Sequence, residues 1–235
     1  MGRKVTDRSI LDEVLGGCSH RPPPQVTCAG LEMPSADRVD IGGLPPAATL
    51  RLAGLAVAFQ DPSLLPWRSV RGNIALALAR RPPDAAAVDR PIGLIGLIGF
   101  GDARPAELPG GMRQRAAIAR APITEPGLLL LDEPFGAVDA LTRAQLAQDL
   151  PRLWDARGTT TVLVTHSVPE AVMLADRVIV LSPRPAQVVA DVAIPLARPR
   201  SPAESRHADF AALVDEIHDA LARRAARGVP VLAAQ

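Results

Sequence analysis

Lysine is almost missing from this sequence of 235 residues. Lys4 is the only one, and the other basic residues are all arginine. A mechanism that needs a lysine beyond the extreme N-terminus is therefore excluded, although a coding bias toward arginine explains the count without any functional cause. Acidic and basic residues nearly balance, and the net charge is +1. Because nucleic-acid partners need a basic surface, we expect no nucleic acid among the partners.

Aromatic residues, cysteines and long apolar runs are also scarce. With no tyrosine and 3% aromatic residues, the core must be built from aliphatic side chains. Two cysteines cannot form a disulfide framework, so a reducing cytosol is the default compartment. No apolar stretch approaches the ~18 residues of a membrane span. The basic start of the chain lacks the apolar segment of a signal peptide. We therefore expect a cytoplasmic, globular protein.

Strand-like and helix-like segments alternate in the second half of the chain. Continuous apolar or β-branched runs predict strands at 127–132, 160–165 and 177–181. Leucines at helical spacing predict a helix between the first two strands, kinked at Pro151. Residues 167–170 have the spacing of a capping box at the start of another helix. This alternation predicts an α/β fold with a parallel sheet that is covered on both faces.

Two further regions are expected to be helical. Residues 61–104 are rich in Pro, Ala and Gly and carry helical patterns near 70–80 and 85–97, which we interpret as a helical insertion. The glycine run at 93–101 lacks the Lys-Ser/Thr ending of a phosphate loop, and we interpret it as a small-residue helix packing face. A final helix carries one apolar stripe formed by Phe210, Leu213, Ile217 and Leu221. Its opposite face mixes acids and bases, so packing on its own domain is favoured over a membrane surface.

Asp132 and Glu133 follow the apolar run 128–131 directly. In a parallel sheet, ligands bind at the carboxyl ends of the strands. One carboxylate there could hold Mg²⁺ while the other faces an attacking water, a pair that suits nucleotide hydrolysis. An Asp-Glu pair after a strand is otherwise often a solvated turn.

Three other features are weak singly. Gly110 and Gly111 open an amphipathic helix, where free backbone N–H groups can bind an anion, although a glycine turn explains them equally well. Gln60 follows a strand at 55–59 and could ligate Mg²⁺ or sense a γ-phosphate. His166 ends the strand at 160–165 and could contact a γ-phosphate or a catalytic water, or be purely structural.

Together, the order and spacing of these features resemble the ATP-binding subunits of ABC transporters. Gln60 stands at the position of the Q-loop, LPGGMRQR resembles the family signature, and LLLLDEP resembles the Walker B strand with its glutamate. Gly136 to Asp139 resemble the D-loop, and His166 the H-loop. The resemblance runs from about residue 29 to residue 222. Within the family, AFQDPSLLPW, ADRVIVLSPRP and the Pro/Arg-rich tail are similar to the importers of nitrate, sulfonates and taurine.

The resemblance implies a P-loop NTPase-like parallel sheet with a helical subdomain. The implied organisation is a degenerate N-terminal part of the nucleotide-binding core (1–60), a helical subdomain (61–109), the signature helix with the rest of the core (110–193), and a C-terminal linker and helix (194–235). It also implies a homodimer that binds ATP and Mg²⁺ between its subunits. Transmembrane permease subunits and, indirectly, a solute-binding protein are the implied partners. The implied location is the inner face of the cell membrane.

The resemblance also assigns roles to residues. Glu133 would be the general base or would orient the water, and His166 would contact the γ-phosphate. Asp132 and Gln60 would serve Mg²⁺. The signature residues would reach the nucleotide held by the other subunit, and Asp139 would cross the dimer interface. The signature residues are Pro109, Gly110, Gly111 and Met112.

The family's Walker A loop, GxxxxGK[ST], is missing, because no lysine follows Lys4. Its backbone amides and lysine would hold the phosphates. The chain is short by about a strand and a loop between Val14 and Cys28, and a deletion or frameshift in the coding sequence is our leading explanation. That loss truncates the first part of the core. Cys18, His20 and Cys28 do not have the spacing of a zinc site.

Pro109 is a second departure, because the family has a serine there whose hydroxyl touches the γ-phosphate. A third is the absence of an aromatic residue near the first hairpin to stack on adenine. From these losses we expect very weak ATP binding and negligible turnover. Two hypotheses follow: an ATPase subunit that energises uptake of a small anion, or a non-hydrolysing subunit that only docks on a permease, including a defective gene product.

Overall fold

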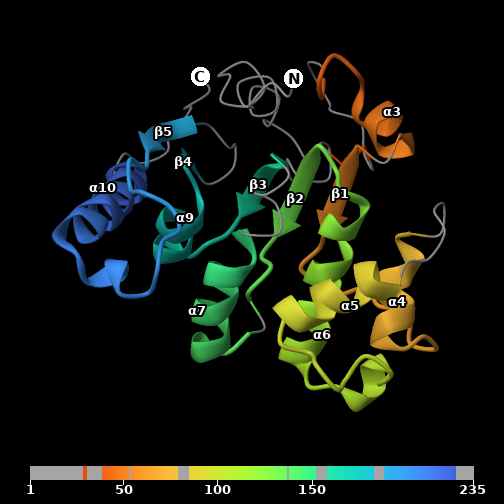
Figure 1. The fold of residues 1–235 in the computed structure, drawn as a ribbon. Helices are drawn as coiled ribbons and strands as arrows, with labels where there is room; N and C mark the ends of the chain where they lie inside the picture. Colours follow the sequence, from red (N-terminus) through yellow and green to blue (C-terminus); the bar gives the residue numbers. More distant parts are fainter. Residues whose placement is uncertain are drawn as a thin grey trace, which may run out of the picture.

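The computed structural model describes residues 29–30, 39–52, 54–78, 85–136, 138–151, 158–182 and 188–225. The predictions made for residues 14–28, the missing Walker A segment and the zinc alternative, lie outside the described residues. The described chain forms a parallel sheet with helices packed around it, and a smaller C-terminal unit of two strands and a long helix (Figure 1). Within the described residues, no helix is both long and apolar enough to cross a bilayer.

The central sheet contains β1 (Leu55–Ala58), β2 (Leu128–Asp132) and β3 (Thr160–Val164), in the order β1-β2-β3. Both neighbouring pairs are parallel. Successive β2 side chains point to opposite faces of the sheet, and both faces are buried. Leu129 and Leu131 join one apolar core, and Leu128 and Leu130 join another. This double burial explains the continuous apolar run and confirms the prediction of a buried parallel strand.

The third predicted strand has the expected bounds but a different partner. β4 (Arg177–Leu181) pairs antiparallel with β5 (Val188–Ala193), and these two strands form a sheet of their own in the described part of the chain. The prediction that this strand extends the parallel sheet is therefore wrong. An apolar run shows that a strand is buried but not which strand it pairs with, and an antiparallel partner a few residues away needs only a short connection.

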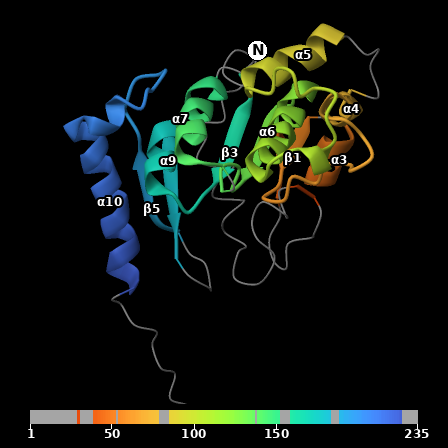
Figure 2. The ribbon, with the colours of Figure 1, turned by 90° about the horizontal axis from the view of Figure 1, so that it is seen from below.

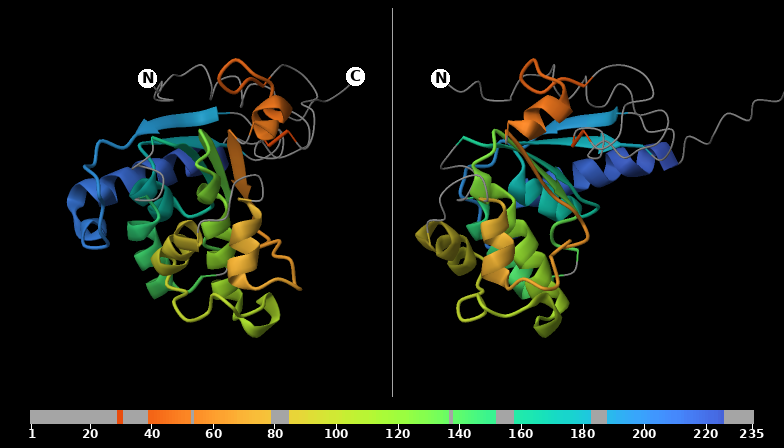
Figure 3. Two further views of the ribbon diagram at one scale, coloured as in Figure 1. Left: turned by 45° about the vertical axis from the view of Figure 1, so that its right-hand side comes forward. Right: turned by 90° about the vertical axis from the view of Figure 1, so that its right-hand side faces the viewer.

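The helical insertion contains α4 (Val70–Leu76) and α5 (Ala85–Leu94), and the helix that follows it, α6 (Gly110–Arg120), packs against both. They lie together beside β1 and β2 (Figures 2 and 3). A short helix, α3 (Pro46–Arg51), packs on β1. Single 3₁₀ turns flank α6, and a third precedes the last helix; they are η1 (Pro105–Glu107), η2 (Pro122–Thr124) and η3 (Glu204–Arg206).

The glycine run does not form a helix packing face, so that prediction is wrong. α5 ends at Leu94, and Gly96 and Gly99 have φ angles of +66° and +85°. These left-handed conformations favour glycine and make turns. A Cβ atom at Gly93 or Gly99 would meet nothing within 4 Å, so close packing does not require these glycines.

The helix after β2 is α7 (Ala140–Asp149), and the helix after β3 is α9 (Val168–Leu174). α7 ends with Leu150 as its C-cap, and Pro151 directly after it is helical again, so the helical hydrogen bonding is interrupted at the predicted kink. Proline lacks the N–H group that would continue the helical hydrogen bonds. The rest of the predicted helix lies outside the described residues.

The C-terminal unit has its own apolar core, formed by α9, β4, β5 and α10 (Ala208–Ala225). Phe210 and Ile217 of the predicted stripe are buried, whereas Leu221 is 43% exposed and Ala220 takes its place in the core. The buried side chains of both units are mainly aliphatic, which confirms that part of the prediction.

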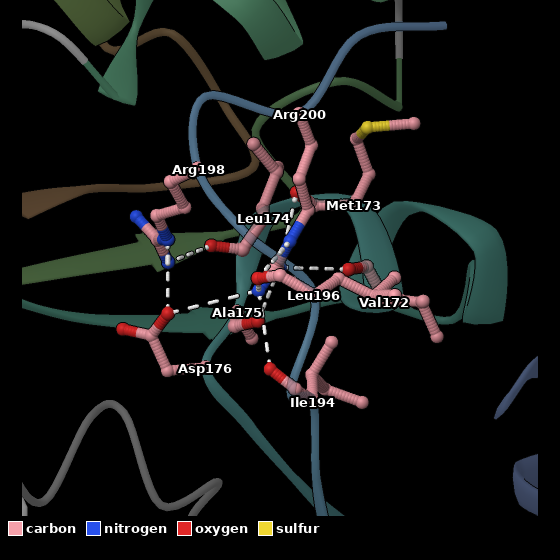
Figure 4. Close-up of polar contacts among 9 residues, drawn as sticks. All are labelled: Val172, Met173, Leu174, Ala175, Asp176, Ile194, Leu196, Arg198 and Arg200. Atoms are coloured by element: carbon pink, nitrogen blue, oxygen red, sulfur yellow. Dashed lines mark hydrogen bonds and ion pairs between the residues drawn. The ribbon is translucent and has the colours of Figure 1, made fainter. Parts of the chain in front are cut away.

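Arg200 joins the segment after β5 to the end of α9 within this unit. Its side chain is 1% exposed, and its guanidinium donates to five backbone carbonyls (Figure 4). The shortest of these bonds reaches the Ala175 oxygen at 2.6 Å. A positive group is favourable at a helix C-terminus, where carbonyls have no helical partner. Arg198 adds a bond to the Leu174 carbonyl and an ion pair with Asp176 at 2.9 Å. The acceptors around Arg200 are the oxygens of Val172, Met173, Ala175, Ile194 and Leu196.

Candidate functional site

The three parallel strands end at one edge, where several candidate residues follow them. The register pairs Ala58 with Leu131 and Asp132 with Val164. Gln60 follows β1 and His166 follows β3, on either side of the Asp132-Glu133 pair that ends β2. The structure therefore places these four residues along one sheet edge, as the parallel topology predicts.

Glu133 and His166 are in direct contact. His166 Nδ1 lies 2.8 Å from Glu133 Oε1, and the two side chains are 81% and 19% exposed, respectively. An ionised carboxylate can only accept, so the imidazole must carry its proton on Nδ1 to make this bond. The ring therefore holds the carboxylate from one side and leaves its other oxygen available to a water.

The backbone of Glu133 aims this side chain. Its N–H donates to the Val164 carbonyl at 2.9 Å, which extends the β2–β3 ladder by one bond. Its φ angle is +45°, a conformation that non-glycine residues seldom adopt and that turns the chain sharply away from the sheet. Such strain costs about 1–3 kcal/mol and persists where the surroundings hold the residue in place.

Glu170 does not complete the predicted capping box. Ser167 is the N-cap of α9, but its side chain makes no capping hydrogen bond. The Glu170 carboxylate instead accepts from the Thr165 hydroxyl through Oε2, and that hydroxyl accepts from the Ser167 N–H at 3.1 Å. The carboxylate of Glu170 therefore bonds to Thr165, the residue before the candidate histidine, and not to the backbone N–H of the N-cap.

The predicted signature segment starts α6 as expected, although Pro109 is the N-cap and not the first helical residue. Pro109 and Gly110 are exposed, Gly111 is half-buried, and Met112 packs against the apolar core. These residues lie with the helical insertion, and within the described part of the chain no hydrogen bond or ion pair joins them to Glu133 or His166.

Two residues that the sequence analysis missed connect α6 to the segment around Gln60. Gln114 is 1% exposed and donates to the Phe59 carbonyl at 3.4 Å. Arg120 donates to the Ser63 carbonyl at 2.9 Å, and burial lowers the pKa of its guanidinium. The sequence signal for Gln114 was its helical spacing, because it precedes Ala117 and Ile118 by three and four residues and so shares their apolar face.

Asp139 has a local role within the chain. It is exposed and is the N-cap of α7, where its carboxylate accepts from the Thr142 N–H at 3.0 Å. The sequence analysis assigned Asp139 to a dimer interface, and the cap was overlooked because the pattern Asp-x-x-Thr lacks the glutamate of a capping box.

Comparison with known proteins identifies the family. A family model described as ABC transporter matches residues 27–136. The taurine import ATP-binding protein TauB of Rhizobium johnstonii is 41% identical over 197 residues, which are 81% of this chain and 68% of that protein. This chain belongs to the ABC transporter family of ATP-binding subunits.

Two other members of this family are similar in sequence to this chain. The aliphatic sulfonates import ATP-binding protein SsuB 2 of Xanthomonas axonopodis pv. citri is 47% identical over 174 residues, covering 74% of this chain and 58% of that protein. The nitrate import ATP-binding protein NrtC of Synechocystis is 46% identical over 169 residues, covering 68% of this chain and 25% of that protein. The chain thus spans between a quarter and about two thirds of the length of these relatives.

Solved ABC cassettes have the same fold. The dimeric post-hydrolysis structure of the ATP-binding cassette MJ0796 with ADP and Pi aligns with a TM-score of 0.63 and 24% identity, covering 73% of this chain and 78% of that chain. This likeness confirms the α/β fold that the resemblance implied.

The sheet edge of this ABC subunit fits Mg²⁺. Asp132 and Gln60 offer oxygen ligands at adjacent strand ends, and oxygen is what Mg²⁺ takes. Within the described residues, no group of three or more His, Cys, Asp or Glu side chains gathers as a metal cage. Proteins usually hold Mg²⁺ by one or two carboxylates together with substrate phosphates and water, so a small donor set of this kind suits the ion.

Proposed function

We propose that this chain is the ATP-binding subunit of an importer for a small anion, a sulfonate, nitrate or taurine. The Glu133–His166 contact at the carboxyl edge of the sheet carries the proposal. Relatives that import each of these anions support the substrate class. In this proposal the chain forms a homodimer on the inner face of the membrane, docks on permease subunits and depends indirectly on a solute-binding protein.

The residues at the sheet edge would divide the work of hydrolysis. Asp132 and Gln60 would hold Mg²⁺, which neutralises charge on the phosphates when it is bound. Glu133 would orient the water and accept its proton at the oxygen that His166 leaves available. His166 would fix the direction of that carboxylate. The signature residues Pro109, Gly110, Gly111 and Met112 would face the nucleotide held by the second subunit, and Asp139 would cross the dimer interface.

The second candidate is a non-hydrolysing subunit that docks on a permease. The lysine count favours it, because residues 5–235 contain no lysine to pair with the β- and γ-phosphates. Both candidates predict weak affinity for Mg·ATP, since the missing lysine and its loop would provide much of the binding free energy for the triphosphate. They differ in whether any hydrolysis depends on Glu133.

Phosphate release at millimolar Mg·ATP separates the two candidates. The proposed ATPase releases phosphate slowly because the lysine is missing, but the release still depends on Glu133, so Glu133→Gln lowers the rate by about 10²-fold or more, as expected for loss of a general base. The matched control is Glu216→Gln, the same change at an exposed position of α10, which leaves the rate unchanged. A rate in the wild type no higher than in Glu133→Gln would favour the docking subunit.

A further inference from the structure

One hydroxyl connects the two sides of His166. The Thr165 hydroxyl accepts a hydrogen bond from the Ser167 N–H at 3.1 Å and donates to Glu170 Oε2. The residues immediately before and after the histidine are thus held by the same oxygen atom. This oxygen is in turn anchored to the first turn of α9, because Glu170 is the third residue of that helix.

Glu170 is held inward at an energetic cost. Its other oxygen, Oε1, is buried and has no hydrogen-bond partner. Burial raises the pKa of Glu170, whereas the Thr165 hydrogen bond and the positive charge of Arg143 act against this rise and the charge of Glu133 adds to it. A glutamate in the first turn of a surface helix could face water at no such cost. Its inward position therefore needs a compensating contact, and the Thr165 hydroxyl provides one.

His166 itself has little packing to hold it. Its side chain is 81% exposed, and β3 ends at Val164 while α9 begins at Val168. The direction of the imidazole therefore depends on the short turn between these elements and on its contact with Glu133. The Thr165 hydroxyl closes that turn.

We propose that Thr165 and Glu170 are positioning residues for His166, and that their hydrogen bond fixes the turn that aims the imidazole at Glu133. The importance of this for hydrolysis rests on the proposed function, but the positioning itself does not. The main alternative is that the Thr165–Glu170 pair only anchors the start of α9. In that case its loss would lower stability without changing the state of the imidazole.

The tautomer of His166 distinguishes these roles. The Nδ1–H form is required for the bond to an ionised Glu133, whereas an imidazole free in water prefers the Nε2–H form. The probe is the full chain labelled with ¹⁵N at histidine, studied by NMR at about pH 8, where an ordinary imidazole is neutral. His166→Gln identifies the signal among those of the four histidines.

The variants remove the hydrogen bond while keeping side-chain volume. Thr165→Val and Glu170→Met each remove one partner, and the double variant replaces both by apolar groups, a change that is often neutral for stability. We expect the Nε2–H form to become the major one in all three. The fraction of His166 in the Nδ1–H form should fall no further in the double variant than in either single variant, because both residues act through one hydrogen bond. Thr165→Ser and Glu170→Gln keep a donor and an acceptor and should keep the Nδ1–H form.

Thr124→Val is the matched control, because the Thr124 hydroxyl bonds to the Ala121 carbonyl in η2, away from α9. It should leave the His166 signal unchanged. A wild-type His166 spectrum in the cooperatively folded double variant would overturn the proposal. The experiment needs no ATP, so a shifted tautomer in a chain that hydrolyses nothing would refute the proposed function and leave the positioning role intact.

Discussion

The imidazole of His166 meets the carboxylate of Glu133 across two adjacent parallel strands, with 2.8 Å between Nδ1 and Oε1. The β2–β3 register sets this distance, because Asp132 pairs with Val164 and these are the last residues of the two strands. The Glu133 N–H extends the same ladder to the Val164 carbonyl. A contact that is built into strand pairing in this way needs no ligand to assemble it.

Removing the imidazole should slow hydrolysis. In His166→Ala the Glu133 carboxylate loses the contact that fixes its direction, and we expect phosphate release at millimolar Mg·ATP to fall by about 10²-fold. His218→Ala, at an exposed position of α10, is the control and should retain the wild-type rate. Full activity in His166→Ala would show that Glu133 needs no orienting partner.

Arg200 should be among the most important residues for stability. Arg200→Met removes the donor from five carbonyls around the end of α9, and we expect the free energy of unfolding to fall by about 3 kcal/mol or more. Chemical denaturation monitored by circular dichroism measures the change. Arg206→Met, an exposed arginine in η3, should change stability by less than about 0.5 kcal/mol. Equal effects of the two substitutions would contradict the anchoring role.

Asp139 should stabilise α7 whether or not the chain dimerises. Asp139→Ala removes the acceptor for the Thr142 N–H and should cost about 1 kcal/mol, whereas Asp139→Ser keeps a cap and should cost much less. The difference between the two denaturation midpoints, measured at low protein concentration, tests the cap. Equal midpoints for the two variants would mean that the cap contributes nothing.

Glu170 should make stability depend on pH. Since burial raises the pKa of Glu170 above its ordinary value of 4.5, the folded state binds this proton more tightly than the unfolded state. The Glu170 contribution to stability is therefore largest at low pH and is lost as the pH rises through the folded pKa. Glutamine does not titrate, so Glu170→Gln does not lose this contribution. The free energy of unfolding of the variant minus that of the wild type should therefore increase between about pH 4.5 and pH 7. Denaturation of both proteins across this range provides the test, and a constant difference would contradict the raised pKa.

Sequence alone was enough to predict the strands that bear the site. The run 128–131 is apolar at every position because both faces of β2 are buried, and the polar residues Asp132 and Glu133 begin where the sheet ends. The start of α6 was also correct, because glycines followed by residues at helical spacing are a local signal. Features encoded by neighbouring residues were therefore predictable.

Features that depend on residues far apart in the sequence could not be predicted. The pairing of β4 with β5 could not be inferred from the apolar run in β4 itself. Glu170 had two possible partners, and only the fold shows that Thr165 is the one it contacts. Arg200 stands in a proline-rich segment without periodicity, and its five acceptors come from segments up to 28 residues earlier in the chain.

Equilibrium binding of labelled ATP to the purified chain, with and without Mg²⁺, tests most directly whether the sheet edge is a nucleotide site. The account predicts saturable binding that is weaker than micromolar, requires Mg²⁺ and is weakened further by Asp132→Asn. No saturable binding at millimolar Mg·ATP, or binding that Asp132→Asn leaves unchanged, would contradict it.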